Sequence, residues 1–164
     1  LPKEGSIAGG RIVSDLAKQG NPQAIRFPRA LEGETDFSFS GLKTSVLNYV
    51  RKLDRAELDA QMADIAASFQ AAAVDSLVDK TIGVVDRGNM DIQAVCLAGG
   101  VAANQPLREA LKTQVEQREL PFHCPSFQYC TDNAAMIGAV GVHRLSRGQV
   151  DDFELDAVPR MSLC

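Results

Sequence analysis

Two stretches of this 164-residue sequence combine glycine, amide and carboxylate groups in patterns that suit ligand binding. In "LAGGVAANQPLREAL", residues 97–111, an apolar run ends in Gly99 and Gly100, and Asn104 stands where a helix should begin. Glycine lets the backbone approach a ligand closely, and the first turn of a helix offers N–H groups to an anion. The spacing matches neither a dinucleotide fingerprint nor a Walker loop. The stretch therefore predicts either an anion site or a plain helix cap after a tight turn.

A second candidate is "YCTDNAAMIGAVG", residues 129–141, in which Asp132 precedes a run of small residues. An exposed carboxylate at the edge of a sheet can ligate a divalent cation or contact a ribose. Alternatively, Thr131 or Asp132 caps the final helix. Close helix packing is predicted for the small residues that follow, namely Ala134, Ala135, Gly138, Ala139 and Gly141.

A third candidate is "DFSFSGLKT", residues 36–44. Ser38, Ser40, Lys43 and Thr44 cluster around a predicted turn, where they can contact phosphate or RNA. A solvated turn with Ser40 as the cap of the next helix is an equally good interpretation.

Several other kinds of chemistry find little support in the residue pattern. His123 and His143 are far apart and fit no metal-binding spacing, and no Ser-His-Asp or Cys-His arrangement is indicated. The four cysteines have no CxxC spacing, which predicts free thiols in a reducing compartment.

Composition and charge place the chain among ordinary soluble globular proteins. Hydrophobic residues make up 45% of the sequence and charged residues 23%, and the net charge is -4. This balance gives no overall basic footprint for nucleic acid. No apolar run is long enough for a membrane span, and "LPKEGSIAGG" at the start lacks the features of a signal peptide. We therefore expect no membrane association.

Hydrophobic periodicity predicts a mainly helical first half. Residues 9–20 predict an amphipathic helix that ends at its final glycine, and residues 21–35 predict a loop rich in proline, glycine and charge. Alternating phenylalanine and serine in "DFSFSG", residues 36–41, predict a short strand. Apolar residues at helical spacing in 42–53 and in the alanine-rich stretch 54–85 predict two helices that pack on each other.

The second half predicts a parallel βαβα unit. A short apolar run at 92–100 ends in two glycines, as a buried parallel strand does. A helix is expected over 104–119, a second strand within 120–125, and a last helix that ends near Gly148. If the two strands are neighbours, the residues that follow each of them lie at the same edge of the sheet. Two strands alone form an incomplete sheet, so we expect further strands N-terminal to this sequence or from a partner chain.

Together, "DFSFSGLKT", "LAGGVAANQPLREAL" and "YCTDNAAMIGAVG" closely resemble the family of tRNA adenosine threonylcarbamoyltransferases, in that family's order and spacing. Older names for the family are O-sialoglycoprotein endopeptidase and glycoprotease. The resemblance extends from about Gly9 to Arg160, and "IRFPRA" and "VPRM" also look like landmarks of the family.

The resemblance implies an α/β fold of the actin-like ATPase type (sugar kinase or Hsp70-like), present here as a partial lobe with a helical insertion. On this basis the predicted organisation is one partial lobe over residues 1–164. It comprises a mostly helical subdomain at 9–88, a βαβα nucleotide-binding subdomain at 89–148 and a C-terminal tail at 149–164.

The resemblance also implies an activity. The family moves a threonylcarbamoyl group from threonylcarbamoyl-adenylate to the adenosine beside the anticodon, in tRNAs that read codons beginning with A. It binds one metal, described as iron or zinc, and works with partner subunits. We therefore expect a metal, an adenylate or ATP ligand, tRNA and partner subunits, with a homodimer as a further option. A cytoplasmic location is expected, and an organellar one is compatible with the sequence.

Residue by residue, the resemblance assigns a small set of positions. Asp132 falls where the family's "CTDN" aspartate ligates the metal, and Asn104 falls where the "GGVAAN" asparagine contacts the adenylate. Gly10 falls on the second glycine of a "PGGP" turn, although "IAGGRI" here lacks both prolines. Gly99 and Gly100 complete the predicted substrate-binding set.

One departure concerns residues that this sequence lacks. The family's two histidine metal ligands, in an HxxxH motif, and its Ser-Gly-Gly phosphate loop do not occur in these 164 residues. We therefore expect the isolated chain to bind metal weakly and to transfer nothing. The alternatives are a metallopeptidase, which the absence of HExxH disfavours, an ATPase or small-molecule kinase of the same fold, and a non-catalytic structural fragment.

Overall fold

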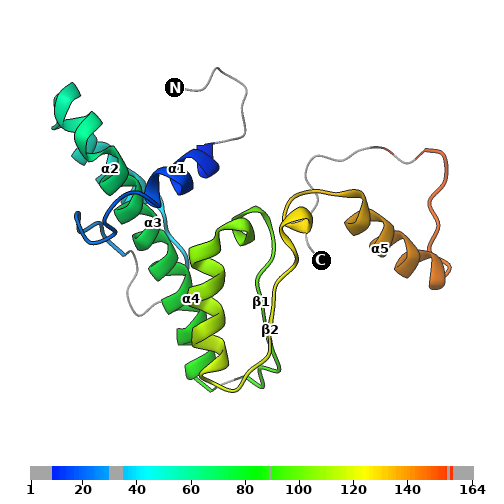
Figure 1. Cartoon of the computed structure of the whole chain (residues 1–164). Helices are drawn as coiled ribbons and strands as arrows, with labels where there is room; N and C mark the ends of the chain where they lie inside the picture. The colour runs from blue at the N-terminus through cyan, green and yellow to red at the C-terminus, as the bar shows by residue number, and fades with distance from the viewer. Residues whose placement is uncertain (1–8, 30–34, 89, 155, 157–164) are drawn as a thin grey trace.

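The computed structural model describes residues 9–29, 35–88, 90–154 and 156, and it joins a helical first half to a strand–helix–strand unit (Figure 1). In chain order the elements are α1 (Gly9–Ala17), α2 (Ser40–Val50), α3 (Arg55–Asp86), β1 (Val95–Cys96), the 3-10 turn η1 (Gly100–Ala103), α4 (Gln105–Glu116), β2 (Phe122–His123), the 3-10 turn η2 (Phe127–Tyr129) and α5 (Ala134–Ser146). The predicted mixed α/β class is confirmed. Within the described part of the chain, no helix is both long and apolar enough to cross a membrane.

The long helix α3 is the scaffold on which α1, α2 and α4 pack. Its start is fixed by a capping box: the Asp54 carboxylate accepts from the Glu57 N–H at 2.8 Å, and the Glu57 carboxylate accepts from the Asp54 N–H at 2.9 Å. Its 32 residues agree closely with the predicted stretch 54–85. Buried residues along its length contact each neighbouring helix: Ala66 packs against α1, Ala72 belongs to the cluster with α2, and Val78 to the cluster with α4.

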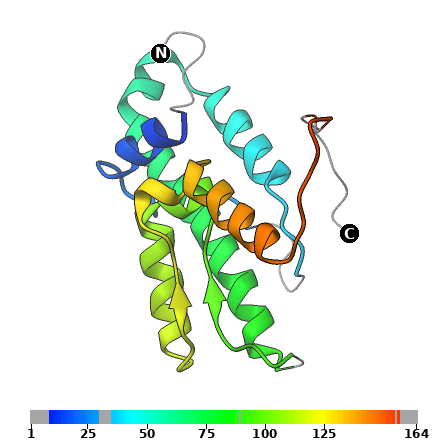
Figure 2. The same cartoon turned by 90° about the vertical axis from the view of Figure 1, so that its right-hand side faces the viewer.

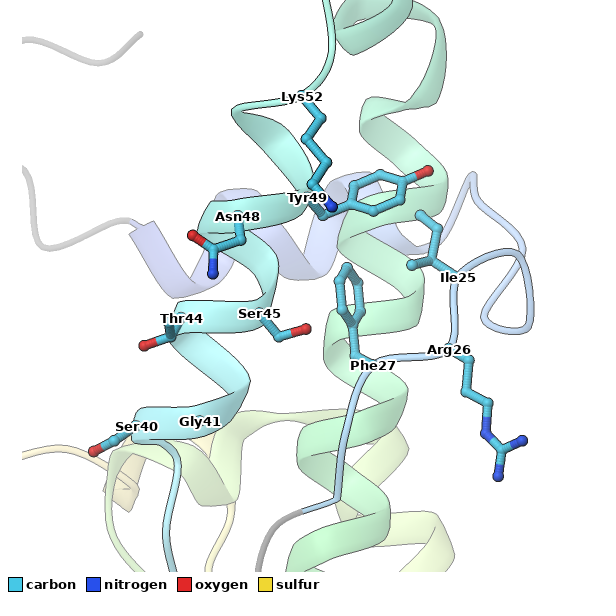
Figure 3. Close-up of a pocket in the computed structure, with 10 residues that line it drawn as sticks. All are labelled: Ile25, Arg26, Phe27, Ser40, Gly41, Thr44, Ser45, Asn48, Tyr49 and Lys52. Atoms are coloured by element: carbon cyan, nitrogen blue, oxygen red, sulfur yellow. The ribbon is translucent and has the colours of Figure 1, made fainter.

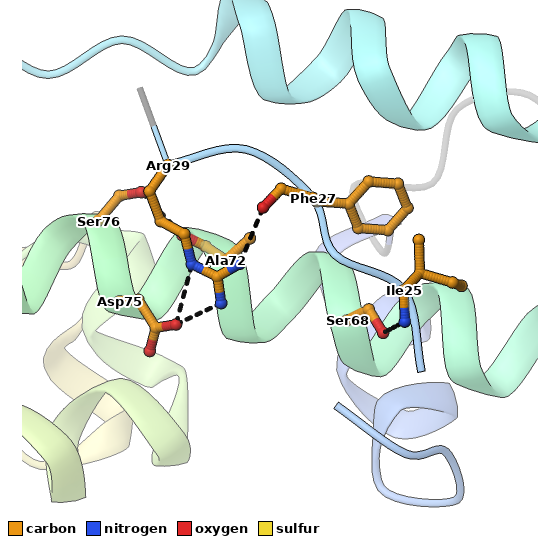
Figure 4. A network of polar contacts seen from close by, with 7 residues as sticks. All are labelled: Ile25, Phe27, Arg29, Ser68, Ala72, Asp75 and Ser76. Atoms are coloured by element: carbon orange, nitrogen blue, oxygen red, sulfur yellow. Dashed lines mark hydrogen bonds and ion pairs between the residues drawn. The ribbon is translucent and has the colours of Figure 1, made fainter. Parts of the chain in front are cut away.

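The loop between α1 and α2 is fastened to α3 by buried and polar contacts. Phe27 is 2% exposed and meets the Tyr49 ring edge-on, with the ring centroids 5.9 Å apart. Figure 4 shows the polar part: the Ile25 N–H donates to Ser68 Oγ at 3.1 Å, and Arg29 Nε donates to Asp75 at 3.1 Å. These contacts give the "IRFPRA" stretch a structural role.

The two strands are parallel neighbours, with Val95 opposite Phe122 and Cys96 opposite His123. Both views show α3 and α4 on one face of this small sheet (Figure 2). A core cluster fills the space between them, and its buried members are Val78, Ile82, Val95, Leu107, Leu111 and Val115. The prediction of parallel strands joined by a helix is confirmed.

Three local expectations are wrong. Residues 36–41 form no strand, because β1 and β2 pair only with each other among the described residues and leave no neighbour for them. Ser40 does not cap α2, since the N-cap is Phe39 and no side chain caps it. The close packing predicted for α5 is also not seen, since none of its residues is buried and Figure 1 shows it apart from the other helices.

The subdomain boundary near residue 88 stays a prediction, and the core cluster of α3, β1 and α4 extends across it. Of the predicted tail, residues 149–154 are described. They are exposed, with Val150 at 72% and Phe153 fully accessible.

Candidate functional site

The loops that follow β1 and β2 carry the candidate residues, and the parallel pairing places both loops at the carboxyl edge of the sheet. Figure 2 shows both chain segments leaving the strand ends beside the start of α4. Asn104 belongs to the first loop and Asp132 to the second. The parallel pairing, on which the prediction of a shared edge depends, is thus confirmed.

The first loop turns sharply at its glycines. Gly99 has φ of +84°, a region that residues with a side chain rarely adopt, and its carbonyl accepts from the Ala102 N–H at 3.0 Å. A Cβ built on Gly99 or Gly100 would meet no atom within 4 Å. The glycines therefore leave open space beside the backbone, as a close ligand approach requires.

Asn104 serves as the N-cap of α4 and still keeps hydrogen-bonding capacity. Its Oδ1 accepts from the Leu107 N–H at 3.0 Å, and its Nδ2 donates to Gln70 Oε1 at 2.8 Å. A side-chain amide has two N–H donors and two acceptor lone pairs, so one of each is left. The capping and ligand-binding interpretations of Asn104 are therefore compatible.

A pocket of about 410 Å³ brings Gly10 and Asn104 to one place. Its walls are mainly apolar, and the residues that line it are Gly9, Gly10, Val13, Phe69, Gln70, Ala73, Val74, Leu77, Val101, Asn104 and Leu107. No atom lies within 4 Å of a Cβ built on Gly10, so its side is open as well. Two candidates that are 94 positions apart in the sequence thus share one cavity, with α3 as the wall between them.

Asp132 is exposed and does not cap α5. The cap is Asn133, whose Oδ1 accepts from the Met136 N–H at 3.2 Å and whose Nδ2 donates to the Thr131 carbonyl at 2.8 Å. The capping interpretation of Thr131 or Asp132 is therefore wrong by one or two positions. The described residues give the Asp132 carboxylate no hydrogen-bond or ion-pair partner, so it is available to a ligand.

The described residues do not form a metal centre by themselves. In the described ranges, no three histidine, cysteine, aspartate or glutamate side chains gather closely enough to hold an ion. His123 and His143 are exposed and belong to β2 and α5. Iron and zinc sites need three or more protein ligands, and the candidate set here supplies Asp132 alone.

The third candidate stretch lines a different pocket, of about 610 Å³, between α2 and the 25–27 loop (Figure 3). Ser40 and Thr44 line it, while Ser38 and Lys43 are not among its lining residues. In Figure 3 the Arg26 side chain points away from the α2 hydroxyls. Lys52, the other basic residue that lines the pocket, lies beside Tyr49 in this view, so Arg26 and Lys52 do not converge on one point as a phosphate site requires.

Two residues that support the loops after β1 and β2, Gln70 and Arg108, were not predicted from the sequence. Gln70 holds the Asn104 amide from α3, 34 positions away, and no local pattern signals such a contact. Arg108 lies within the 97–111 stretch, and no local pattern there distinguishes it from an ordinary helix-surface arginine. In the structure it hydrogen-bonds to Ala102 in the first loop and to Pro125 in the second.

Comparison with known proteins gives a consistent match. Residues 3–139 match the family model described as tRNA N6-adenosine threonylcarbamoyltransferase. Proteins of that name from Caldicellulosiruptor saccharolyticus, Geotalea uraniireducens and Symbiobacterium thermophilum are 43%, 45% and 46% identical to this chain. The matches extend over 94%, 92% and 94% of this chain but only 46%, 44% and 45% of those proteins. The chain therefore spans less than half the length of these relatives.

Proposed function

The chain belongs to the tRNA N6-adenosine threonylcarbamoyltransferase family, and we propose that it forms the part of such an enzyme that holds threonylcarbamoyl-adenylate. The observation that carries this proposal is the pocket shared by Gly10 and Asn104. An adenine ring has apolar faces and a polar edge. Apolar walls from α1 and α3 suit the faces, and the free N–H and lone pair of Asn104 suit the edge.

The proposed fold is a partial lobe of the actin-like ATPase type with a helical insertion. Support comes from the parallel strands, the helix that connects them and the two ligand-competent loops at the carboxyl edge. Residues 9–88 would then be the insertion that supplies the α1 and α3 walls of the pocket.

In the proposed reaction the protein acts by positioning. The substrate is a mixed anhydride, so its carbonyl carbon is already activated. The adenosine amine attacks that carbon, a C–N bond forms, and the C–O bond to AMP breaks with its electron pair leaving on the phosphate. The amine proton passes to solvent. No nucleophile from the protein is needed, and correct placement of the two reactants accounts for a large share of the rate.

Within this scheme Asp132 is proposed as the single metal ligand that this chain contributes. Its exposure, the lack of a partner for it among the described residues and its place in the loop that follows β2 support that role. Because one carboxylate does not make an iron or zinc site, no reaction step is assigned to a metal here. The tRNA substrate and the partner subunits are proposals on the same basis, carried by the family match.

A chimera tests the proposal directly. This chain replaces the matching segment of the Caldicellulosiruptor saccharolyticus relative, with which it is 43% identical over 155 residues. Transfer of labelled threonylcarbamoyl from the adenylate to tRNA is then measured. We expect activity in the chimera and a loss of about tenfold or more in kcat/KM for Asn104→Ala, since one hydrogen bond to the ligand is removed.

The matched control is Asp59→Ala, which removes an exposed carboxylate on α3 whose partner among the described residues is Arg55, one helical turn away. It should leave transfer unchanged. Full activity of a folded Asn104→Ala chimera would contradict the proposed substrate site. An ATPase or kinase would instead be indicated by consumption of ATP with a small-molecule acceptor and no transfer to tRNA.

A further inference from the structure

The Arg108 guanidinium lies between the two loops of the candidate site and binds both. Its Nε donates to the Ala102 carbonyl, which belongs to the turn after Gly99 and Gly100. Its Nη2 donates to the Pro125 carbonyl at 2.7 Å and to Cys130 Sγ at 2.9 Å. One side chain on α4 thus connects the glycine loop to the loop that leads to Asp132.

The contact is of a kind that only arginine makes. The guanidinium is a rigid planar fork with five donors, so it can bind carbonyl groups on separate loops at the same time. Its flat face also stacks on Phe127, with the Cζ atom 4.2 Å from the ring centroid. A lysine has a single ammonium group on a flexible stem and cannot make both sets of contacts together.

Among the described residues, Arg108 makes the side-chain hydrogen bonds that join the second loop, residues 124–133, to an earlier element. Cys130 is 1% exposed and accepts from Arg108, and its own thiol lies 3.6 Å from the Ser126 carbonyl. Asp132 follows two residues later, and α5, which comes next, buries none of its residues. The position of Asp132 relative to Asn104 therefore depends on β2 and on the Arg108 contacts.

We propose that Arg108 is a positioning residue that sets the spacing between the glycine loop with Asn104 and the loop with Asp132. Arg108 acts through the two loops and is assigned no contact with substrate. The functional meaning of that spacing rests on the proposed function, whereas the mechanical coupling of the two loops does not.

The experiment uses the 164-residue chain with Arg108→Met, which keeps the length of the stem but removes every donor. Hydrogen exchange of the backbone amides in 99–104 and 125–133 and the alkylation rate of Cys130, followed by mass spectrometry, report on the two loops. Both loops should exchange faster, by about tenfold, and Cys130 should be alkylated faster by a similar factor. Amides of the buried part of α4, residues 111–115, should keep their exchange rates.

Two further variants separate positioning from simple stabilisation. Arg108→Lys restores the charge and most of the stem, and should leave at least one loop as fast as in Arg108→Met, because one ammonium cannot bind both. Lys112→Met removes a positive charge one turn further along the same helix, where Lys112 pairs with Glu116 and with no other described residue, and it should change neither loop. Unchanged exchange in both loops, full rescue by lysine, or a uniform rise that includes 111–115 would overturn the proposal.

A measurement on the unaltered chain keeps the proposal testable if Arg108→Met does not fold. The Arg108 Nε–H should exchange with solvent at least about tenfold more slowly than the exposed Nε–H of Arg11, because it is bound to a carbonyl. Equal exchange of the two groups would contradict the coupling.

AMP binding to the same chain distinguishes failure of this inference from failure of the proposed function. If AMP perturbs the pocket in the unaltered chain, Arg108→Met should weaken its affinity by a few-fold through the loosened glycine loop, and unchanged affinity would count against Arg108 as a positioning residue. If AMP does not bind at all, the proposed substrate pocket fails, while the exchange data still decide whether Arg108 couples the loops.

Discussion

The helices α4 and α5 begin in the same way but differ in burial: α4 packs in the core, whereas α5 is exposed. Each follows a parallel strand and a 3-10 turn, and each is capped by an asparagine whose side chain accepts an N–H of the first turn. Yet α4 buries Leu107, Leu111 and Val115 almost completely, whereas Ile137 and Leu145 of α5 are 77% and 65% exposed. Local sequence thus suffices to begin and end a helix, while burial depends on what the rest of the molecule supplies.

Because of this difference in burial, the two loops of the candidate site have different support from the rest of the molecule. The loop before α4 is supported by α3, the core cluster and Gln70, and it borders a formed pocket. The loop before α5 is supported by Arg108, and its helix presents apolar side chains to solvent in the described structure. We therefore expect the substrate side of the site to tolerate little change and the Asp132 side to be mobile in this chain.

The largest expected contrast comes from the same substitution in the two helices. Leu111→Ala creates a cavity in the core cluster and should lower the free energy of unfolding by about 2–5 kcal/mol. Leu145→Ala removes a largely exposed side chain and should change it by less than about 0.5 kcal/mol. Urea denaturation followed by circular dichroism measures both. Similar losses in the two variants would show that α5 is packed after all.

Glycine substitutions give the next contrast. A Cβ on Gly20 would lie 2.0 Å from the Ala63 carbonyl oxygen, so Gly20→Ala should destabilise the chain by about 1–3 kcal/mol through a backbone shift. A Cβ on Gly138 in α5 meets nothing within 4 Å, so Gly138→Ala should be neutral or stabilising by about 0.5–1 kcal/mol, from helix propensity. Thermal unfolding of the two variants checks the opposite signs. A destabilising Gly138→Ala would indicate a close neighbour of α5.

The asparagine caps of the two helices, Asn104 of α4 and Asn133 of α5, give a third contrast in stability. Asn133→Ala should cost about 1 kcal/mol of helix stability, and Asn104→Ala somewhat more because it also loses the Gln70 contact. Asp132→Ala should change the free energy of unfolding by less than about 0.5 kcal/mol, since its carboxylate has no partner among the described residues. Equilibrium unfolding separates the three. A loss for Asp132→Ala as large as that for Asn133→Ala would return Asp132 to a capping role.

The smallest expected effect is the pH dependence that arises from the Arg118–Asp86 ion pair, beside the C-terminal ends of α3 and α4. Arg118 donates two hydrogen bonds to the Asp86 carboxylate, which lowers the pKa of Asp86 below its ordinary value of 3.8. A carboxyl group whose pKa falls on folding stabilises the folded state above the unfolded pKa, and this contribution is lost as pH falls through the lower, folded pKa. The carboxyl carbon shift of Asp86 in a pH titration should show a midpoint below 3.8.

Substitution of Arg118 by methionine is the control for this titration. It should move the Asp86 midpoint back toward its ordinary value, because the hydrogen bonds from the guanidinium are the main cause of the shift. An unchanged midpoint would mean that the ion pair between the ends of α3 and α4 does not form in solution.

The sequence predicted the elements whose signals are local and strong. The periodicity of 54–85 and 104–119 defined α3 and α4 to within a few residues, and short apolar runs before turn residues located both strands. The predicted strand at 36–41 failed because the alternation of phenylalanine and serine says nothing about whether a neighbouring strand exists. The predicted packing of α5 failed for a similar reason, since small residues permit close approach but do not provide a partner.

Prediction of the candidate site was limited by distance along the chain. Asn104 and Asp132 were placed at one edge from the order of strands and helices alone. The contacts that support them, from Gln70 and Arg108, join segments far apart in sequence and became visible only in three dimensions. The cap of α5 was missed by one position because three adjacent residues, Thr131 to Asn133, all have side chains that can cap a helix.

The most direct test of the central claim is the binding site of the adenylate on this chain. A stable analogue of threonylcarbamoyl-adenylate is titrated into the labelled protein, and the backbone amide shifts are followed by NMR. We expect the largest shifts at Gly10, Gln70 and in residues 99–107. We also expect the Asn104→Ala variant to bind the analogue more weakly. The proposed adenylate site would be contradicted by shifts centred on the pocket between α2 and the 25–27 loop. It would also be contradicted if a chain whose spectrum shows it to be folded gave no shifts at all.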